Sequence, residues 1–276
     1  MHLTKHHGLG NDFLVVLDDP STGTVAPADD RLPELARRLC DRHRGLGADG
    51  LIAGRRPPEG SSADVVMVLH NADGSRAEMS GNGIRCLAQA VVAARGGDGA
   101  TLTIATDGGD RQVTVTPVER AGEVAVRVAM GTVGSGPAVP ASLLERLGGS
   151  RHATVDVGNP HLVVEVADPS AVDLATEGPA LEAAFPDGIN VEFVAAGPDD
   201  RLELVVWERG AGITEACGTG ACAAASVAHR WGVVGEHVEV GMPGGSAQVV
   251  LEGDDATLIG PSVRIAAVDV DDEVLA

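Results

Sequence analysis

The sequence predicts an α/β protein of the mixed α+β kind, built from two similar domains. The main observation is an internal repeat: Glu-Met-Ser-Gly-Asn-Gly at 78–83 and Glu-Ala-Cys-Gly-Thr-Gly at 215–220 each precede an alanine-rich stretch that predicts a helix. Segments of strand composition, separated by turn residues, surround both copies. The chain therefore contains the same strand–helix–strand order twice, and we expect the sheets to be mostly antiparallel.

The first half should contain one helix before the repeat and several strands. An apolar run predicts a strand at Phe13–Leu17, and helical spacing predicts a helix at Leu32–Arg42 with Pro33 in its first turn. The helix after the first Gly-rich phrase is expected at Ile84–Ala94. Further strands are expected at 64–69, 101–106, 112–116 and 123–129.

The second half repeats this order. Gly158–Val164 matches Gly10–Val16, and a strand at Leu202–Trp207 precedes the second Gly-rich phrase and its helix at Ala221–His229. We place the domain boundary in the Gly-, Pro- and Ser-rich segment Gly131–Pro140. The first domain is then 1–130 and the second 131–261, and residues 262–276 could return to complete the first domain. Later strands are expected at 238–240, 247–251, 256–259 and 263–270.

Composition argues against several classes of function. The formal net charge is −20 and the chain has no Tyr, two Trp and three Phe, so no nucleic-acid partner is expected. Lys5 is the only lysine, which leaves one candidate Schiff-base residue for pyridoxal phosphate and none for a phosphate-binding loop. No apolar run reaches the ~18 residues of a membrane helix, and no signal peptide is recognisable. We therefore expect a cytoplasmic, cofactor-free protein with no membrane partner.

The cysteines and histidines predict no metal site. Cys40, Cys86, Cys217 and Cys222 form no C-x-x-C pair, and the histidines are scattered without paired spacing. Free thiols are expected, and three of them should be small buried side chains in helical segments. Cys217 differs because it directly precedes a Gly-rich helix start.

The second Gly-rich phrase can combine anion binding with acid–base chemistry. Free N–H groups and the helix dipole at Gly218 and Thr219 favour a carboxylate. The same field should lower the pKa of Cys217 and give a thiolate near neutrality. Ser80, followed by Gly81 and Asn82, supplies the corresponding element in the first half.

Two such elements suit inversion of a carbon centre. Without pyridoxal, removal of an α-proton needs preorganised N–H donors and exclusion of water. A base on one side of the carbon and an acid on the other then invert it. Two similar domains predict a cleft between them, where we expect the active site.

The asparagines favour a polar cradle for the substrate. The chain has only five, Asn11, Asn71, Asn82, Asn159 and Asn190, and four of them lie in the repeated Gly-Asn phrases or just ahead of the first Gly-rich turn. An amide offers donors and an acceptor to an amino acid, although a single Asn is more often a turn residue. Glu208 and Arg209 could hold a distal ammonium and carboxylate, or form an ordinary surface ion pair.

Long motifs spread in order along the chain resemble diaminopimelate epimerase: 5–13, 42–50, 71–86, 158–161 and 207–223. The resemblance implies two pseudo-symmetric domains, each a curled sheet or barrel around a central helix. It implies cofactor-free, two-base interconversion of LL- and meso-diaminopimelate in lysine biosynthesis, by a homodimer. It also implies catalysis by residues 80 and 217, tuning of the thiol by His161 and Glu208, and substrate contacts from Asn11, Asn71, Gly81, Asn82, Asn159, Asn190, Glu208, Arg209, Gly218 and Thr219.

Two positions depart from this resemblance. The family's first catalytic thiol is replaced by Ser80, a far weaker acid, and Ile213 stands where the family usually has Glu. Ser80 could be an engineered Cys→Ser change, part of a natural Ser/Cys subgroup that still epimerises, or the mark of a paralogue. Such a paralogue would be an epimerase, racemase or dehydratase acting on another amino acid.

Two other classes remain as alternatives. Gly218–Ala223 fits the G-x-G-x-x-A pattern of dinucleotide-binding oxidoreductases, but the preceding strand ends near Trp207, too far upstream for a tight turn. A catalytically impaired amino-acid-binding protein would keep the cradle and lose the proton transfer. Solvent deuterium at Cα separates it from an epimerase.

Overall fold

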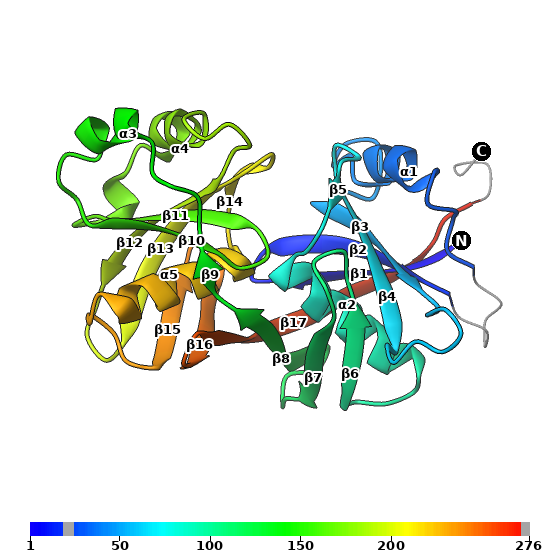
Figure 1. The fold of residues 1–276 in the computed structure, drawn as a ribbon. Coiled ribbons are helices and arrows are strands. Elements are labelled where there is room, and N and C mark those ends of the chain that lie inside the picture. Colours follow the sequence, from blue (N-terminus) through cyan, green and yellow to red (C-terminus); the bar gives the residue numbers. More distant parts are fainter. Residues whose placement is uncertain (19–24, 272–276) are drawn as a thin grey trace. The chain divides into compact units, whose positions relative to one another are not determined.

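The chain folds into two compact units, Met1–Val128 with Gly260–Ala276, and Ala129–Ile259 (Figure 1). The computed structural model describes residues 1–18 and 25–271. Each unit is a curled sheet wound around one helix, which confirms the predicted fold class.

The first unit is a closed ring of strands around helix α2. The ring runs β17–β1–β2–β3–β4–β6–β7–β8 and closes by pairing of β8 with β17, where the Arg264 amide donates to Gly122 O at 2.7 Å. Pairs β2–β3 and β4–β6 are parallel and the other pairs with a described register are antiparallel. The elements are β1 His2–Gly8, β2 Asn11–Leu17, α1 Leu32–Leu39, β3 Gly50–Arg55, β4 Val65–Asn71, β5 Arg76–Ala77, α2 Gly81–Ala94, β6 Ala100–Ala105, β7 Arg111–Pro117, β8 Glu123–Thr132 and β17 Asp255–Asp269.

The second unit repeats this plan around helix α5. Strands β11 and β12 are parallel, β13 is antiparallel to β12, and β15 returns parallel to β13 after the helix. This is the order of β2, β3, β4, α2 and β6 in the first unit. The elements are β9 Gly134–Ser135, α3 Ala141–Arg146, β10 His152–Asp156, β11 Pro160–Glu165, a 3-10 turn Pro169–Ala171, α4 Leu174–Glu182, β12 Asn190–Ala196, β13 Arg201–Glu208, β14 Gly212–Thr214, α5 Gly218–Arg230, β15 His237–Met242 and β16 Gly245–Glu252.

Both central helices are buried on nearly all sides and consist mainly of small and apolar residues, with Asn82, Arg85 and Gln89 as buried polar residues of α2. Residues 81–92 of α2 and 218–228 of α5 are buried. Both helices begin three residues earlier than the sequence predicted, because the glycines of each repeat form the first helical turn. The small residues of that turn permit close approach of the surrounding strands.

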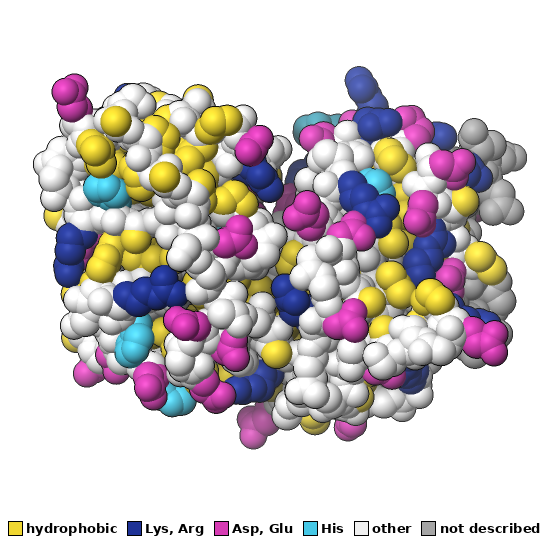
Figure 2. Space-filling view, in the orientation of Figure 1, with side chains coloured by type: hydrophobic (Ala, Val, Ile, Leu, Met, Phe, Trp, Pro, Cys, Tyr) yellow, Lys and Arg dark blue, Asp and Glu magenta, His cyan; other side chains and the backbone are white. Residues whose placement is uncertain are grey.

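Charged side chains are interspersed on the face drawn in Figure 2, with arginines next to acids. Typical exposed pairs are Arg76 with Asp107 at 2.5 Å and Arg146 with Glu177 at 2.9 Å. Such pairs contribute little stability singly. Across the described part of the chain, the helices are too short or too polar to span a bilayer.

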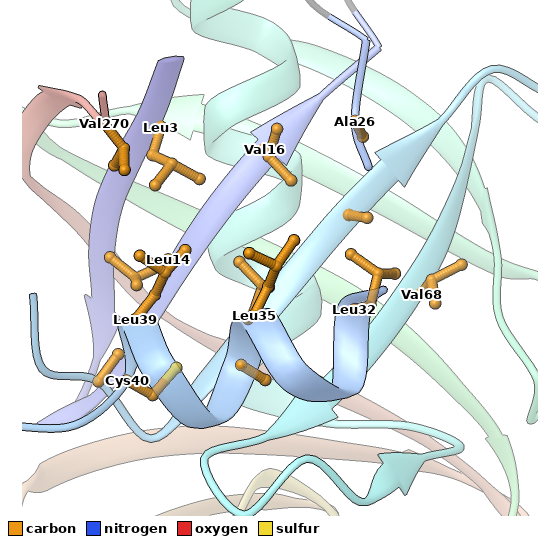
Figure 3. Close-up of a cluster of buried hydrophobic side chains, with 14 residues drawn as sticks. Leu3, Leu14, Val16, Ala26, Leu32, Leu35, Leu39, Cys40, Val68 and Val270 are labelled. Carbon is orange, nitrogen blue, oxygen red and sulfur yellow. The ribbon is translucent and has the colours of Figure 1, made fainter. Parts of the chain in front are cut away.

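Helix α1 packs one apolar face on the outside of the first unit's sheet (Figure 3). Leu32, Leu35 and Leu39 point at the sheet, where they form a buried cluster with Leu14 and Val16 of β2 and Val68 of β4. The helix ends at Leu39 rather than at Arg42 as predicted. The reason is local: the amides of 46 and 47 donate to Leu39 O, and the carboxylate of Asp41 accepts from the amides of 43 and 44.

Leu35→Ala should lower the free energy of unfolding by about 2–5 kcal/mol, since it leaves a cavity in this cluster. Leu35 is 3% exposed. Chemical denaturation measures the change, with Arg38→Ala on the exposed side of the same helix as the control. An effect of Leu35→Ala no larger than that of Arg38→Ala would contradict the packing described here.

Candidate functional site

The first unit's half-site begins at Ser80, the N-cap of α2. Its backbone is extended (φ −142°, ψ 121°), and its hydroxyl accepts a hydrogen bond from the Gly83 amide at 3.0 Å. This satisfies one of the amides that a helix start leaves without an intrahelical acceptor. Gly81 and Asn82 form the start of the first helical turn, whose amides point toward the N-terminal end of the helix and suit an anionic group.

A chain of side-chain hydrogen bonds orients two of the predicted substrate contacts. Asn11 donates from Nδ2 to Asp49 Oδ2 at 2.8 Å, and Asn82 donates from Nδ2 to Asn11 Oδ1 at 3.2 Å. Arg85, fully buried, donates to Asn82 Oδ1 at 2.7 Å and to Gly81 O at 3.1 Å. Asp49 and Arg85 thereby fix which way both amides point, and neither was a predicted site residue.

A half-exposed ion cluster around the buried Asp12 fixes Asp49 in turn. Arg42 donates to Asp12 Oδ1 at 2.8 Å and to Asp49 Oδ1 at 2.7 Å, and Lys5 Nζ lies 3.0 Å from Asp12 Oδ2. Burial alone would raise the pKa of Asp12, but the hydrogen bonds from Arg42 and Lys5 outweigh it and hold that pKa below its usual value. The only lysine is therefore held as a structural cation.

Asn71 occupies a turn of its own. It ends β4, and its Nδ2 donates to Ser75 Oγ at 3.0 Å while its backbone accepts from the Gly74 amide at 2.8 Å. This is the turn-forming arrangement that a single Asn usually adopts. Its role as a substrate contact stays a prediction.

The second unit's half-site begins at Cys217, the N-cap of α5. Its backbone is again extended (φ −125°, ψ 116°), and Sγ accepts from the Gly220 amide at 3.3 Å and lies 3.4 Å from Thr219 Oγ1. The thiol is placed on α5 as the Ser80 hydroxyl is placed on α2. The repeat detected in the sequence is thus a repeat of N-cap geometry.

The pKa of Cys217 moves opposite to the direction predicted from the helix terminus. Burial raises it well above the usual value, the carboxylates of Glu208 and Glu192 raise it further, and hydrogen bonds from Thr219 and Gly220 only partly compensate. Burial likewise raises the pKa of Glu208, against hydrogen bonds from Thr214 and Cys217. The resting thiol is therefore protonated, beside a carboxyl group that is itself a weaker acid than usual.

Two of the other three cysteines also have raised pKa values. All four cysteines are free, as expected. All four are also buried, which was expected for three of them. Burial raises the pKa of Cys40 and of Cys86 to about 12.

His161 lies behind this half-site with both ring nitrogens engaged. Nδ1 is 2.6 Å from Glu192 Oε1, and Nε2 is 2.9 Å from Asn159 Oδ1. His161 and Glu192 are fully buried. Glu192 was not a predicted site residue, although a single acid inside the apolar strand 190–196 is a visible signal.

Asn190 and Arg209 are joined by a hydrogen bond, and each also contacts the backbone of another residue. Asn190 donates from Nδ2 to Pro160 O at 3.0 Å and accepts from the Arg209 amide at 2.9 Å. The Arg209 guanidinium donates to Asp187 O at 3.1 Å.

Thr214 donates to Glu208, and neighbouring Ile213 is 57% exposed on β14.

Within each unit, most of the predicted residues gather at the start of the central helix, whereas Asn71, Asn190 and Arg209 are held by separate contacts. The first unit brings together Asn11, Ser80, Gly81 and Asn82; the second brings together Asn159 with His161, and Glu208 with Cys217, Gly218 and Thr219. Among the described residues, no group of three or more His, Cys, Asp or Glu could hold a metal ion. The N-cap thiol with a buried acid beside it is an arrangement suited to proton transfer.

A family model described as diaminopimelate epimerase matches residues 3–135 and 153–265. The chain belongs to the diaminopimelate epimerase family. The diaminopimelate epimerases of Synechococcus elongatus and Pelotomaculum thermopropionicum are 39% and 40% identical to it, over 96% of this chain in both cases and over 96% and 97% of theirs. The motifs that suggested this family thus lie in a match that spans both units.

Solved structures with the same fold are more distant in sequence. A hydroxyproline epimerase from Agrobacterium vitis aligns with a TM-score of 0.71 at 19% identity, covering 97% of this chain and 91% of that one. A phenazine biosynthesis protein of the PhzF family from Bacillus anthracis aligns with a TM-score of 0.72 at 14% identity, covering 98% of both chains. At such identities the likeness shows a shared fold alone.

Proposed function

We propose that this member of the diaminopimelate epimerase family interconverts LL- and meso-diaminopimelate by proton transfer at Cα, without a cofactor. The observation that carries the proposal is the protonated Cys217 thiol at the N-cap of a buried helix, with Glu208 beside it. The proposed substrate is taken from relatives named diaminopimelate epimerase, which are about 40% identical to this chain.

In this proposal Cys217 is the proton carrier of the second unit. In one direction the thiol donates its proton to the planar carbanion, and in the other the thiolate removes the α-proton. Glu208, whose pKa burial raises, can take or return the thiol proton. The Gly218 and Thr219 amides stabilise charge on the substrate carboxylate as the carbanion forms.

Ser80 is the proposed counterpart in the first unit. Its hydroxyl is too weak an acid to be a stable anion near neutrality, so it acts as one step of a proton relay rather than as an isolated base. The oriented amides of Asn11 and Asn82, and those of Asn71, Asn159 and Asn190, are the proposed substrate contacts together with Arg209. The reaction requires both proton carriers to act on the same carbon.

Incubation with LL-diaminopimelate in D2O tests the proposal. We expect the meso isomer to accumulate, with deuterium at the inverted Cα, as shown by chiral chromatography with mass spectrometry. Substrate binding without entry of deuterium would support an amino-acid-binding protein instead. Inversion of proline or hydroxyproline, but not of diaminopimelate, would move the assignment to another substrate.

The assembly and location form part of the proposal. A homodimer is the expectation from the family, and light scattering on the purified chain measures it. Free cysteines, all four buried, fit the reducing cytoplasm. A stable monomer that turns over diaminopimelate would correct the first point without affecting the reaction.

A further inference from the structure

The two half-sites can be compared residue by residue, because the strand registers of the two units coincide. In the first unit Phe13 lies opposite Gly50 on parallel strands β2 and β3, and in the second His161 lies opposite Asn190 on β11 and β12. Two residues further along β3 and β12, Ile52 and Glu192 correspond. An apolar pair in one unit is therefore replaced by an ionisable pair in the other.

Ile52 and Glu192 occupy equivalent places under the central helices. A Cβ built on Gly83 would lie 3.2 Å from Ile52 Cδ1, and one built on Gly220 would lie 2.8 Å from Glu192 Oε1. The amides of Gly83 and Gly220 donate to the side chains of the N-cap residues Ser80 and Cys217. The carboxylate thus lies directly beneath the turn that carries the thiol.

The geometry of His161 points to a doubly protonated ring. Both ring nitrogens lie within hydrogen-bond distance of an oxygen, Glu192 Oε1 at 2.6 Å and Asn159 Oδ1 at 2.9 Å. A ring that donates from both nitrogens satisfies both oxygens. Its positive charge is then paired with the Glu192 carboxylate at a site where both side chains are fully buried.

A purely structural role does not account for this pair. Glu192 Oε2 is buried and has no hydrogen-bond partner among the described residues, which is costly. The first unit packs the same position with Ile52 and avoids that cost. Replacing a buried ion pair by apolar groups of similar volume is often neutral or stabilising.

We propose that Glu192 is a positioning residue that acts through His161 on Asn159. The Glu192 carboxylate holds His161 in its doubly protonated form, and the ring holds the Asn159 side-chain oxygen. The Asn159 NH2 group is then the part of the amide left to donate to a substrate oxygen. This rests on the proposed function for the substrate, whereas the protonation of His161 does not depend on it.

Glu192→Gln is the direct test, with Glu203→Gln on an exposed strand position as the matched control. In the Glu192→Gln variant the neutral amide oxygen no longer stabilises a charged ring, so His161 becomes neutral and the Asn159 amide turns to donate to it. Imidazole 15N NMR at neutral pH should show two protonated nitrogens at His161 in the unchanged chain and in Glu203→Gln, and one in Glu192→Gln. KM for diaminopimelate should rise roughly tenfold in Glu192→Gln, with a smaller change in kcat.

Two further variants separate positioning from folding. Asn159→Ala should raise KM similarly, and the combination with Glu192→Gln should add little to it. His161→Phe with Glu192→Ile, which copies the first unit's pair, should fold with undiminished stability and still show the raised KM.

Either of two results would overturn the inference: a His161 ring that stays doubly protonated in Glu192→Gln, or KM effects of Glu192→Gln and Asn159→Ala that multiply. If the unchanged chain does not turn over diaminopimelate, the proposed function fails, and the NMR comparison still decides the protonation of His161.

Discussion

Cys217→Ser is expected to fold normally and to lose roughly 10²–10⁴-fold in kcat/KM, the usual contribution of a positioned acid or base. The fold should survive because a hydroxyl at this N-cap can accept from the Gly220 amide, as Ser80 accepts from Gly83 at 3.0 Å. Proton transfer should slow by this factor, since a hydroxyl is a much weaker acid than a thiol in the same surroundings.

The measurement is epimerisation of LL-diaminopimelate in D2O, followed by loss of chirality and entry of deuterium. Cys222→Ala, on the same helix and equally buried, is the control and should keep its turnover. Thermal unfolding should give closely similar midpoints for Cys217→Ser and the unchanged chain. Full activity in Cys217→Ser would refute the role of Cys217 and with it the proposed reaction.

The sequence was sufficient to predict the architecture because the repeat is a repeat of local structure. The two Gly-rich phrases mark N-caps, and cap geometry is decided by a few neighbouring residues. The helix after each phrase was predicted for the same reason, whereas the strand at Phe13–Leu17 was predicted from its apolar run. Strand β3 and helix α4 were among the elements missed, since β3 contains Gly50 and Gly54, which weaken a strand pattern, and α4 contains Gly178 and Pro179, which weaken a helical one.

The site was only partly predictable, because its decisive features come from contacts between distant segments. The direction of the Cys217 pKa depends on burial and on Glu192 and Glu208, and these two acids lie on different strands. The helix terminus, which is local, predicted the opposite direction for this pKa. The orientation of Asn11 depends likewise on Asp49, 38 positions away.

Ser80→Cys is expected to raise kcat by about 10²-fold or more, because it supplies a second thiol where a hydroxyl now serves as a relay. The thiol can take the place of the hydroxyl at the N-cap of α2, since Cys217 does so at α5 with an N–H···S distance of 3.3 Å. The residues around position 80 nevertheless differ from those around position 217: Asn71, Ile52 and Phe13 correspond in chain order and register to Glu208, Glu192 and His161. The positions that correspond to Glu208, Glu192 and His161 therefore offer a new thiol no ionisable side chain with which to exchange its proton.

Because the residues near position 80 are neutral and those near position 217 are ionisable, both a gain and a loss of turnover in Ser80→Cys would be informative. Turnover should be measured from the LL and the meso isomer in D2O, with Ser80→Ala as the control that removes the hydroxyl. A large gain in Ser80→Cys together with a loss in Ser80→Ala is the expected pattern for a relay that a thiol improves. Turnover in Ser80→Cys equal to or below that of the unchanged chain would contradict the prediction. It would show that, among the neutral residues of the first unit, Ser80 transfers protons at least as well as a thiol does, so that Ser80 and Cys217 suffice as the two proton carriers.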